Sequence, residues 1–267
     1  MADEPVLLTI DGPIAILTLN RPAALNALDE AMADALYAAL VRVEHHKEAR
    51  CLVVRGAGDH FMAGGDVKAF ARAVGELSPR DRQPTFEQIV GRVHASILAL
   101  RHLRLPVVVA VHGAVAGFGV SLMLACDLAI AADDTRFTLA YCQIGTSPDG
   151  GSTFHLPRAV GMKRAMEMAL LGDRIDAPTA ERIGLVNRVV PAASLDGEVA
   201  TVAARLAAGP TAAYARTKEL LTAAFDHNLA THLGWECDRF VASTATRDFA
   251  EGVTAFVEKR PPSFQGR

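Results

Sequence analysis

The chain has 267 residues, of which 51% are hydrophobic, with a formal net charge of −3 and a pI near 6.3. This length and hydrophobic content can bury a large core, either as one large domain or as one domain with an appendage. The nearly balanced charge argues against a broad basic surface for nucleic acid.

No membrane span is predicted, because no apolar run reaches transmembrane length without interruption. The closest, residues 106–132, is broken by three glycines and by His112, Ser121 and Asp127. The nine histidines show no HExxH pattern, so no metal site is expected. The cysteines form no CxxC pair and no signal peptide precedes them, which favours reduced thiols and a cytoplasmic location: Cys51, Cys126, Cys142 and Cys237.

The first elements in chain order are a hairpin and a helix. Val6–Ile10 and Ile14–Leu19 flank Asp11-Gly12-Pro13, a pattern typical of two strands joined by a tight turn. A helix is expected to begin near Leu28-Asp29, because apolar residues then recur every three or four positions: Met32, Leu36, Leu40 and Val43.

Strands and helices then alternate, which predicts an α/β fold with right-handed crossovers. The expected elements are a strand at 51–54, a helix at 89–100, a strand at 106–111, a helix including 122–125, and a strand at 128–131. The polar, proline-containing stretch from Gly75 to Pro84 is expected to be a mobile surface loop.

Strand signals cease after Val189-Val190-Pro191, and consecutive helices are expected from about Ser194 to Glu258. We therefore predict an α/β core over residues 1–193 and a C-terminal helical region over 194–267. This helical region is too thin to bury its own apolar faces, so it must pack on the core or on another subunit.

The glycine-rich segments do not match nucleotide-binding or hydrolase motifs. Phe61 and Leu122 stand where the third glycine of a GxGxxG motif belongs, and no GKS or GKT is present. The segment beginning at Gly119 lacks the closing glycine of a GxSxG motif.

Two of these segments have another capability. Residues 61–66 follow a strand, and residues 112–119 lie between a strand and a helix. Small residues there let a ligand approach the backbone, and amides from both turns could bind one developing oxyanion. From the glycines alone, two close-packing turns are the favoured alternative.

A further turn carries an acid. Residues 146–154 read TSPDGGSTF, in which Pro148, Asp149 and the glycines suit a turn. Asp149 is either a turn former that bonds its own backbone or an acid that moves protons.

Several segments in this order resemble the enoyl-CoA hydratase/isomerase (crotonase) superfamily, from near residue 6 to residue 260. The matching segments are Arg21–Leu28, Phe61–Lys68, Pro106–Gly119, Ala125–Leu128, Gly184–Val186 and Ala255–Arg260. The resemblance implies a crotonase-like spiral of ββα units with a C-terminal helical trimerisation region. The implied partners are an acyl-CoA thioester and other copies of the chain, as a homotrimer or a dimer of trimers. No cofactor is implied besides the coenzyme A of the substrate.

The resemblance also implies positions for the site. The thioester oxygen would lie between the backbone amides of Ala63 and Phe118. Expected contacts with substrate or coenzyme A come from this chain and, for Phe256 and Lys259, from a neighbouring subunit: Ala24, Leu25, Ala63, Gly64, Gly65, Asp66, Lys68, Gly117, Phe256 and Lys259.

This sequence departs from the family's hydratases at two positions. Their two glutamates would fall at Ser121 and Tyr141, and neither side chain can replace a carboxylate base near neutral pH. Ordinary hydration is therefore not expected.

The surroundings of Asp149 resemble enoyl-CoA isomerases of the phenylacetate-pathway type, in which an aspartate in this turn shuttles a proton. In 4-chlorobenzoyl-CoA dehalogenases, a nucleophilic aspartate, a catalytic histidine and an active-site tryptophan match Asp149, His94 and Tyr141. Three hypotheses follow: an isomerase using Asp149; a hydratase, dehalogenase or hydrolase using Asp149 with His94; and a non-enzymatic CoA-binding or RNA-associated scaffold, which the acidic pI disfavours. His94 and Tyr141 are therefore candidate site residues beside Asp149.

Overall fold

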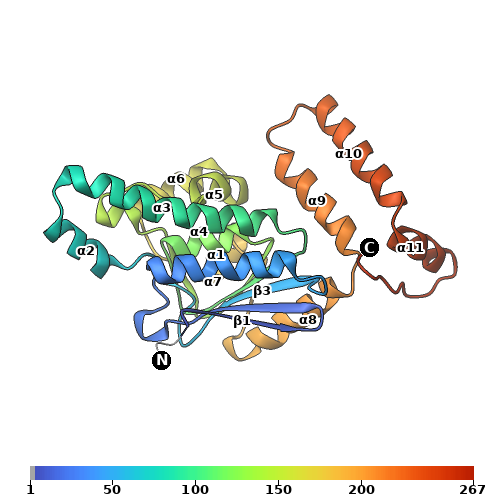
Figure 1. Ribbon diagram of the computed structural model, residues 1–267, viewed down its shortest axis with the longest axis horizontal. Coiled ribbons are helices and arrows are strands. Elements are labelled where there is room, and N and C mark those ends of the chain that lie inside the picture. Colours follow the sequence, from blue (N-terminus) through green and yellow to red (C-terminus); the bar gives the residue numbers. More distant parts are fainter. Residues whose placement is uncertain (1–3) are drawn as a thin grey trace.

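The computed structural model describes residues 4–267 and opens with the predicted hairpin (Figure 1). β1 (Val6–Asp11) pairs antiparallel with β2 (Ile14–Leu19), and Gly12 has φ +54° in the turn between them. The predicted helix is α1 (Glu30–His45), whose N-cap Asp29 accepts a hydrogen bond from the amide of Met32.

The main sheet has six strands in the order β1-β2-β3-β4-β6-β9. From β2 onward, neighbouring strands are parallel. The remaining members are β3 (Cys51–Gly56), β4 (Val107–Val111), β6 (Leu128–Ala132) and β9 (Arg188–Val190). The strands expected from the sequence at 51–54, 106–111 and 128–131 are therefore confirmed.

A second, smaller sheet contains β5 (Ala114–Ala116), β7 (Arg136–Thr138) and β8 (Ile175–Asp176). An isolated bridge pairs Met62, in the loop after β3, with Val115 of β5. Helix α4 (Phe118–Ala125) leads from β5 back to β6 of the main sheet. The chain thus alternates between two sheets, as the predicted spiral of ββα units requires.

Helices cover both faces of the main sheet (Figure 1). Leu52 and Val54 of β3 face the cluster that contains the buried residues of α1 and α3 (Pro79–His102). Cys51 and Val53, which alternate with them, face α8 (Leu195–Ala207). By its packing, α8 belongs with the α/β core, although it follows the expected boundary at residue 193.

The stretch from Gly75 to Pro84 is not the mobile loop that we expected. α2 (Val67–Glu76) ends there and α3 begins at Pro79, so only Leu77 and Ser78 separate two helices. Ser78 is the N-cap of α3 and accepts a hydrogen bond from the amide of Asp81 at 3.3 Å. Ser-Pro at N-cap and N1 is a helix-start signal, which the exposed, polar character of the segment obscured.

Three further α-helices and three short 3-10 turns complete the core. They are η1 (Pro22–Ala24), η2 (Tyr141–Ile144), α5 (Ser152–Val160), α6 (Met162–Leu171), α7 (Ala177–Arg182) and η3 (Ala192–Ser194). Within residues 4–267, no helix is both long enough and apolar enough to cross a membrane.

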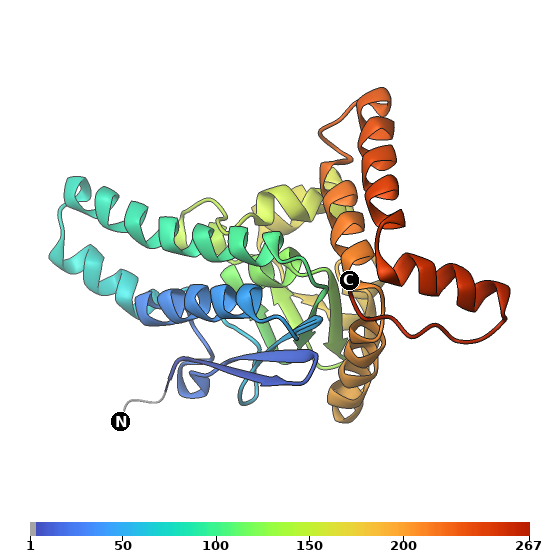
Figure 2. The ribbon, with the colours of Figure 1, turned by 45° about the vertical axis from the view of Figure 1, so that its right-hand side comes forward.

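The last three helices form an arm that extends from the core (Figures 1 and 2). They are α9 (Thr211–Ala223), α10 (Leu229–Thr244) and α11 (Arg247–Val257). Large apolar side chains on the arm are exposed: Leu221, Phe225, Leu229, Leu233, Phe240, Val241, Val253, Phe256 and Val257. The predicted succession of helices is confirmed, and the arm leaves much apolar surface uncovered within one chain.

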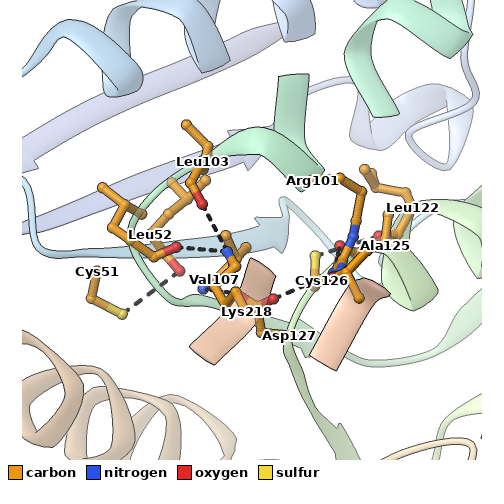
Figure 3. A network of polar contacts seen from close by, with 12 residues as sticks. Cys51, Leu52, Arg101, Leu103, Val107, Leu122, Ala125, Cys126, Asp127 and Lys218 are labelled. Carbon is orange, nitrogen blue, oxygen red and sulfur yellow. Dashed lines mark hydrogen bonds and ion pairs between the residues drawn. The ribbon is translucent and has the colours of Figure 1, made fainter. Parts of the chain in front are cut away.

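A polar network fastens the base of the arm to the core (Figure 3). The Lys218 ammonium on α9 lies 2.7 Å from the Asp127 carboxylate and donates to the carbonyls of Leu103 and Leu105. Arg101 of α3 contacts the other Asp127 oxygen at 3.3 Å and donates to Thr222 of α9. The three charged side chains are only 14–21% exposed, so their attraction is weakly screened.

The end of the chain makes a second attachment. Residues 261–267 return from α11 to the base of α9 (Figure 2). The buried Asp248 carboxylate accepts hydrogen bonds from the amides of Gln265 and Gly266. Arg50, before β3, donates to the carbonyls of Phe264 and Gly209. The arm is therefore held to the core at both of its ends.

We expect Asp127→Asn to lower the free energy of unfolding by about 2–3 kcal/mol, because two partly buried cations lose their counter-charge. The matched control is Arg92→Ala. Arg92 forms exposed ion pairs with Glu30 and Asp34, and the loss there should stay below about 1 kcal/mol. Urea denaturation followed by circular dichroism measures both. Equal losses in the two variants would contradict the role given to the network.

Candidate functional site

Two glycine turns meet at the centre of the site. Gly64 (φ +94°) lies in the loop after β3, and Gly117 (φ +50°) precedes α4. A Cβ built on Gly117 would lie 3.4 Å from the Cα of Gly64, and one on Gly64 would lie 3.2 Å from the carbonyl of Ala116. Both the positive φ angles and this close backbone approach favour glycine.

The residues that follow these glycines carry amides without a partner. Among residues 4–267, neither the N–H of Gly65 nor that of Phe118 donates to a protein acceptor. Phe118 is the first residue of α4, where an amide has no acceptor within its own helix. Two unoccupied donors on touching backbone segments can bind a single anionic oxygen.

The prediction that the backbone amide of Ala63 binds the thioester oxygen is wrong. This amide donates to the carbonyl of Leu25 at 3.0 Å, so it is not available to a substrate. The free donor on this turn belongs to Gly65, two residues later. Sequence reasoning placed Gly65 only among the contact residues, because it could not show which amides of the loop the protein itself uses.

The other contact residues of the core surround the first turn. Ala24 ends η1 and is followed by Leu25, whose carbonyl holds Ala63. The Asp66 carboxylate accepts hydrogen bonds from the amides of Lys68 and Ala69, so Asp66 acts as the N-cap of α2. Lys68 is exposed in the first turn of that helix.

The turn that bears Asp149 packs against the second donor. Gly150 and Gly151 have φ +61° and +78°, and a Cβ on Gly150 would lie 2.7 Å from the Phe118 ring. The backbone carbonyl of Asp149 accepts hydrogen bonds from the hydroxyls of Ser121 at 2.8 Å and Ser152 at 3.1 Å. The turn is thus held by protein donors next to Phe118.

Tyr141 is directed at the acid. Its hydroxyl donates to Oδ1 of Asp149 at 2.5 Å and lies 3.4 Å from the Ser121 hydroxyl. Burial raises the pKa of Tyr141, and the charge of Asp149 and the hydrogen bond to it raise the pKa further. Tyr141 therefore stays a neutral donor, and Oδ2 of Asp149 has no protein partner within residues 4–267.

His94 of α3 lies at the same turn. Its Nε2 accepts a hydrogen bond from the amide of Gly150 at 3.4 Å, which makes this nitrogen the unprotonated one in that contact. The side chain is otherwise exposed. The structure thus brings together His94, Tyr141, Asp149 and Phe118, four of the residues singled out from the sequence.

Phe256 and Lys259 are not near these residues in one chain. Phe256 on α11 is 85% exposed, and Lys259 follows the same helix in the arm (Figures 1 and 2). If they contact coenzyme A, they must do so on another copy of the chain.

A cavity borders the first glycine turn. It has a volume of about 1050 Å³ and includes Leu25, Ala63 and Ala116 in its lining. Three arginines also line it: Arg55 of β3, Arg136 of β7, and Arg174 just before β8. Asp149, Tyr141 and His94 do not line this cavity.

Comparison with known proteins finds relatives over nearly the whole chain. The model of the enoyl-CoA hydratase/isomerase family matches residues 9–267. A Rhodobacter capsulatus protein named "Probable enoyl-CoA hydratase" is 39% identical over all of both chains. The 1,2-epoxyphenylacetyl-CoA isomerase of Escherichia coli is 35% identical over 99% of both. The crystal structure of an enoyl-CoA hydratase from Polaromonas superimposes with a TM-score of 0.91, at 35% identity, over 97% of this chain and 99% of that one.

Proposed function

The chain belongs to the enoyl-CoA hydratase/isomerase family, and within it we propose an enoyl-CoA isomerase that shifts a double bond with Asp149 as its proton shuttle. The proposal rests on one observation: Asp149 is the carboxylate on the turn that packs against Phe118, whose amide is free, while positions 121 and 141 carry only hydroxyls. One carboxylate suffices for this reaction, because the proton taken from one carbon is returned to another.

In the proposed reaction, the amides of Gly65 and Phe118 donate to the thioester oxygen of a 3-enoyl-CoA. Asp149 Oδ2 takes a proton from carbon 2, and the electron pair of the broken C–H bond moves into a dienolate whose charge lies on the thioester oxygen. The new O–H bond then breaks as the proton passes to carbon 4, which leaves the double bond between carbons 2 and 3. The two amides stabilise the charge while it exists.

Hydration is a weaker proposal for this site. It requires a base that activates water, and the pKa of Tyr141 is raised by burial, away from the range of a base. Ser121 is fully buried and donates to a backbone carbonyl. Neither group is placed to hold and deprotonate water.

His94 supports a second candidate function, in which Asp149 attacks the substrate and His94 assists a hydrolysis or dehalogenation. The supporting observation is that the exposed His94 ring contacts the turn that bears Asp149. We rank it second because His94 Nε2 already accepts the Gly150 amide, which suits a residue that holds the turn.

The substrate proposal extends to coenzyme A. We propose that Ala24, Leu25, Gly64 and Lys68 of one chain contact it, and that Phe256 and Lys259 of another chain complete the site. Coenzyme A enters as part of the substrate, and the chemistry needs no separate cofactor. With four free cysteines among the described residues, we place the protein in the cytoplasm.

Replacing one amide by an ester tests the oxyanion donors. Glycolic acid in place of Gly65 removes the N–H and leaves all side chains unchanged, and turnover of a 3-enoyl-CoA should fall by about 10²–10³-fold. Lactic acid in place of Ala63 is the matched control, because it removes the N–H that bonds Leu25. It should cost about 1 kcal/mol of stability and little turnover. A larger loss of turnover at Ala63 than at Gly65 would reverse the assignment.

Asp149→Asn tests the proton shuttle. The amide keeps the volume and much of the hydrogen bonding of the turn but cannot carry the proton. We expect normal folding, retained binding of the CoA thioester, and at least about 10²-fold lower isomerase turnover. Exchange of solvent deuterium at carbons 2 and 4 should disappear as well. Wild-type turnover in the folded variant would leave Asp149 as a turn former only.

His94→Ala separates the two candidate functions. The isomerase proposal predicts a modest loss, while the hydrolase or dehalogenase proposal predicts a severe one. Double-bond shift, hydration and thioester hydrolysis should be assayed side by side on the same panel of acyl-CoA thioesters, with and without an aryl halide. A severe loss of hydrolysis with no isomerisation in the wild type would favour the second candidate.

We also propose that the arm packs against other copies, as a homotrimer or a dimer of trimers. The support is the uncovered apolar surface of α9–α11 on an arm that is fixed to its own core. Sedimentation velocity should show a trimer or hexamer, and Val257→Glu should dissociate it. Val74→Glu, at another exposed valine, on α2, is the matched control and should leave the assembly intact. A stable wild-type monomer at micromolar concentration would refute this proposal.

A further inference from the structure

The two hydroxyl residues that stand in place of the hydratase glutamates both contact Asp149. Tyr141 donates to its side chain, and Ser121 donates to its backbone carbonyl. We propose that Ser121 and Tyr141 are positioning residues that together hold Asp149 with one carboxylate oxygen bound and the other presented to the substrate. This inference rests on the proposed role of Asp149 as a proton shuttle.

The side chain at position 121 is packed directly against the turn that carries Asp149. Ser121 is completely buried, and a Cβ on Gly150 would lie 2.9 Å from the Cβ of Ser121. A long acidic side chain at position 121 would therefore compete for the space of the turn. A small hydroxyl at this position leaves room for the turn and supplies the hydrogen bond that holds it.

The two donors act on different parts of the acid. The Ser121 bond restrains the backbone, and a second hydroxyl, that of Ser152, reaches the same carbonyl. The Tyr141 bond restrains rotation of the carboxylate, because it takes Oδ1. Oδ2 is then the oxygen that receives the proton from the substrate and gives it back.

The neutral hydroxyl of Tyr141 is a suitable hydrogen-bond donor to a carboxylate that acts as a base. Among residues 4–267, no lysine, arginine or histidine forms an ion pair with Asp149. A neutral phenol orients the carboxylate without adding the full positive charge that would weaken it as a base. Burial raises the pKa of Tyr141, so the phenol keeps its proton as the carboxylate changes charge.

Tyr141→Phe removes only the hydroxyl, and Tyr37→Phe, on the exposed face of α1, is the matched control. With a 3-enoyl-CoA we expect kcat to fall by about 10–10²-fold in Tyr141→Phe, since a misplaced catalytic group costs rate. KM should stay within about threefold, and Tyr37→Phe should match the wild type. Ser121→Ala should lower kcat in the same direction.

A label experiment separates positioning from general damage to the structure. With substrate deuterated at carbon 2, one held oxygen should return part of the label to carbon 4 before it exchanges with water. In Tyr141→Phe the carboxylate is free to rotate, so the returned fraction should fall. In an Asp149→Asn background, Tyr141→Phe should lower kcat no further, because the two residues act as one unit.

A pH titration of tyrosine absorbance, which needs no substrate, tests the contact between Tyr141 and Asp149 even if Tyr141→Phe fails to fold. Because the Asp149 charge raises the pKa of Tyr141, phenolate absorbance from Tyr141 should begin at lower pH in Asp149→Asn than in the wild type. The proposed positioning role would be overturned by an unchanged pH of onset of phenolate absorbance in Asp149→Asn. It would also be overturned by wild-type kcat and a wild-type fraction of returned label in Tyr141→Phe. Full turnover in Asp149→Asn would instead refute the proposed function itself.

Discussion

The close approach of Gly64 and Gly117 is the contact on which the rest of the site depends. It joins a loop of the main sheet to the start of α4, next to the second sheet. Side chains on either residue would push the two segments apart, and the unoccupied amides that follow them would no longer share one region. The main sheet, the bridge from Met62 to Val115 and the buried helix α4 all support this single backbone contact.

Around this contact, some polar groups form hydrogen bonds within the protein and others have no protein partner. The amide of Ala63 and the carboxylate of Asp66 are used within the protein, by Leu25 and by the start of α2. The amides of Gly65 and Phe118 and one oxygen of Asp149 are left over. Groups without a protein partner at a partly buried site are those that a substrate can satisfy at the least cost of reorganisation.

The sequence predicted most of the core, because apolar periodicity and turn residues act locally. The hairpin, α1 and the strands lie where Gly12, Asp29 and the valine-rich runs placed them. The start of α3 was missed because its residues are polar on all sides. The donor at Gly65 was missed because the partner of Ala63 is a carbonyl 38 positions earlier, and no local pattern reports such a hydrogen bond.

The attachment of the arm at two points has a consequence for how copies of the chain would meet. Lys218 ties the arm at its first helix, and Arg50 ties it again near the chain end. A segment closed into a loop in this way has lost much of its freedom before it meets a partner. Association would then be an encounter between preformed bodies, in which little conformational entropy is left to lose.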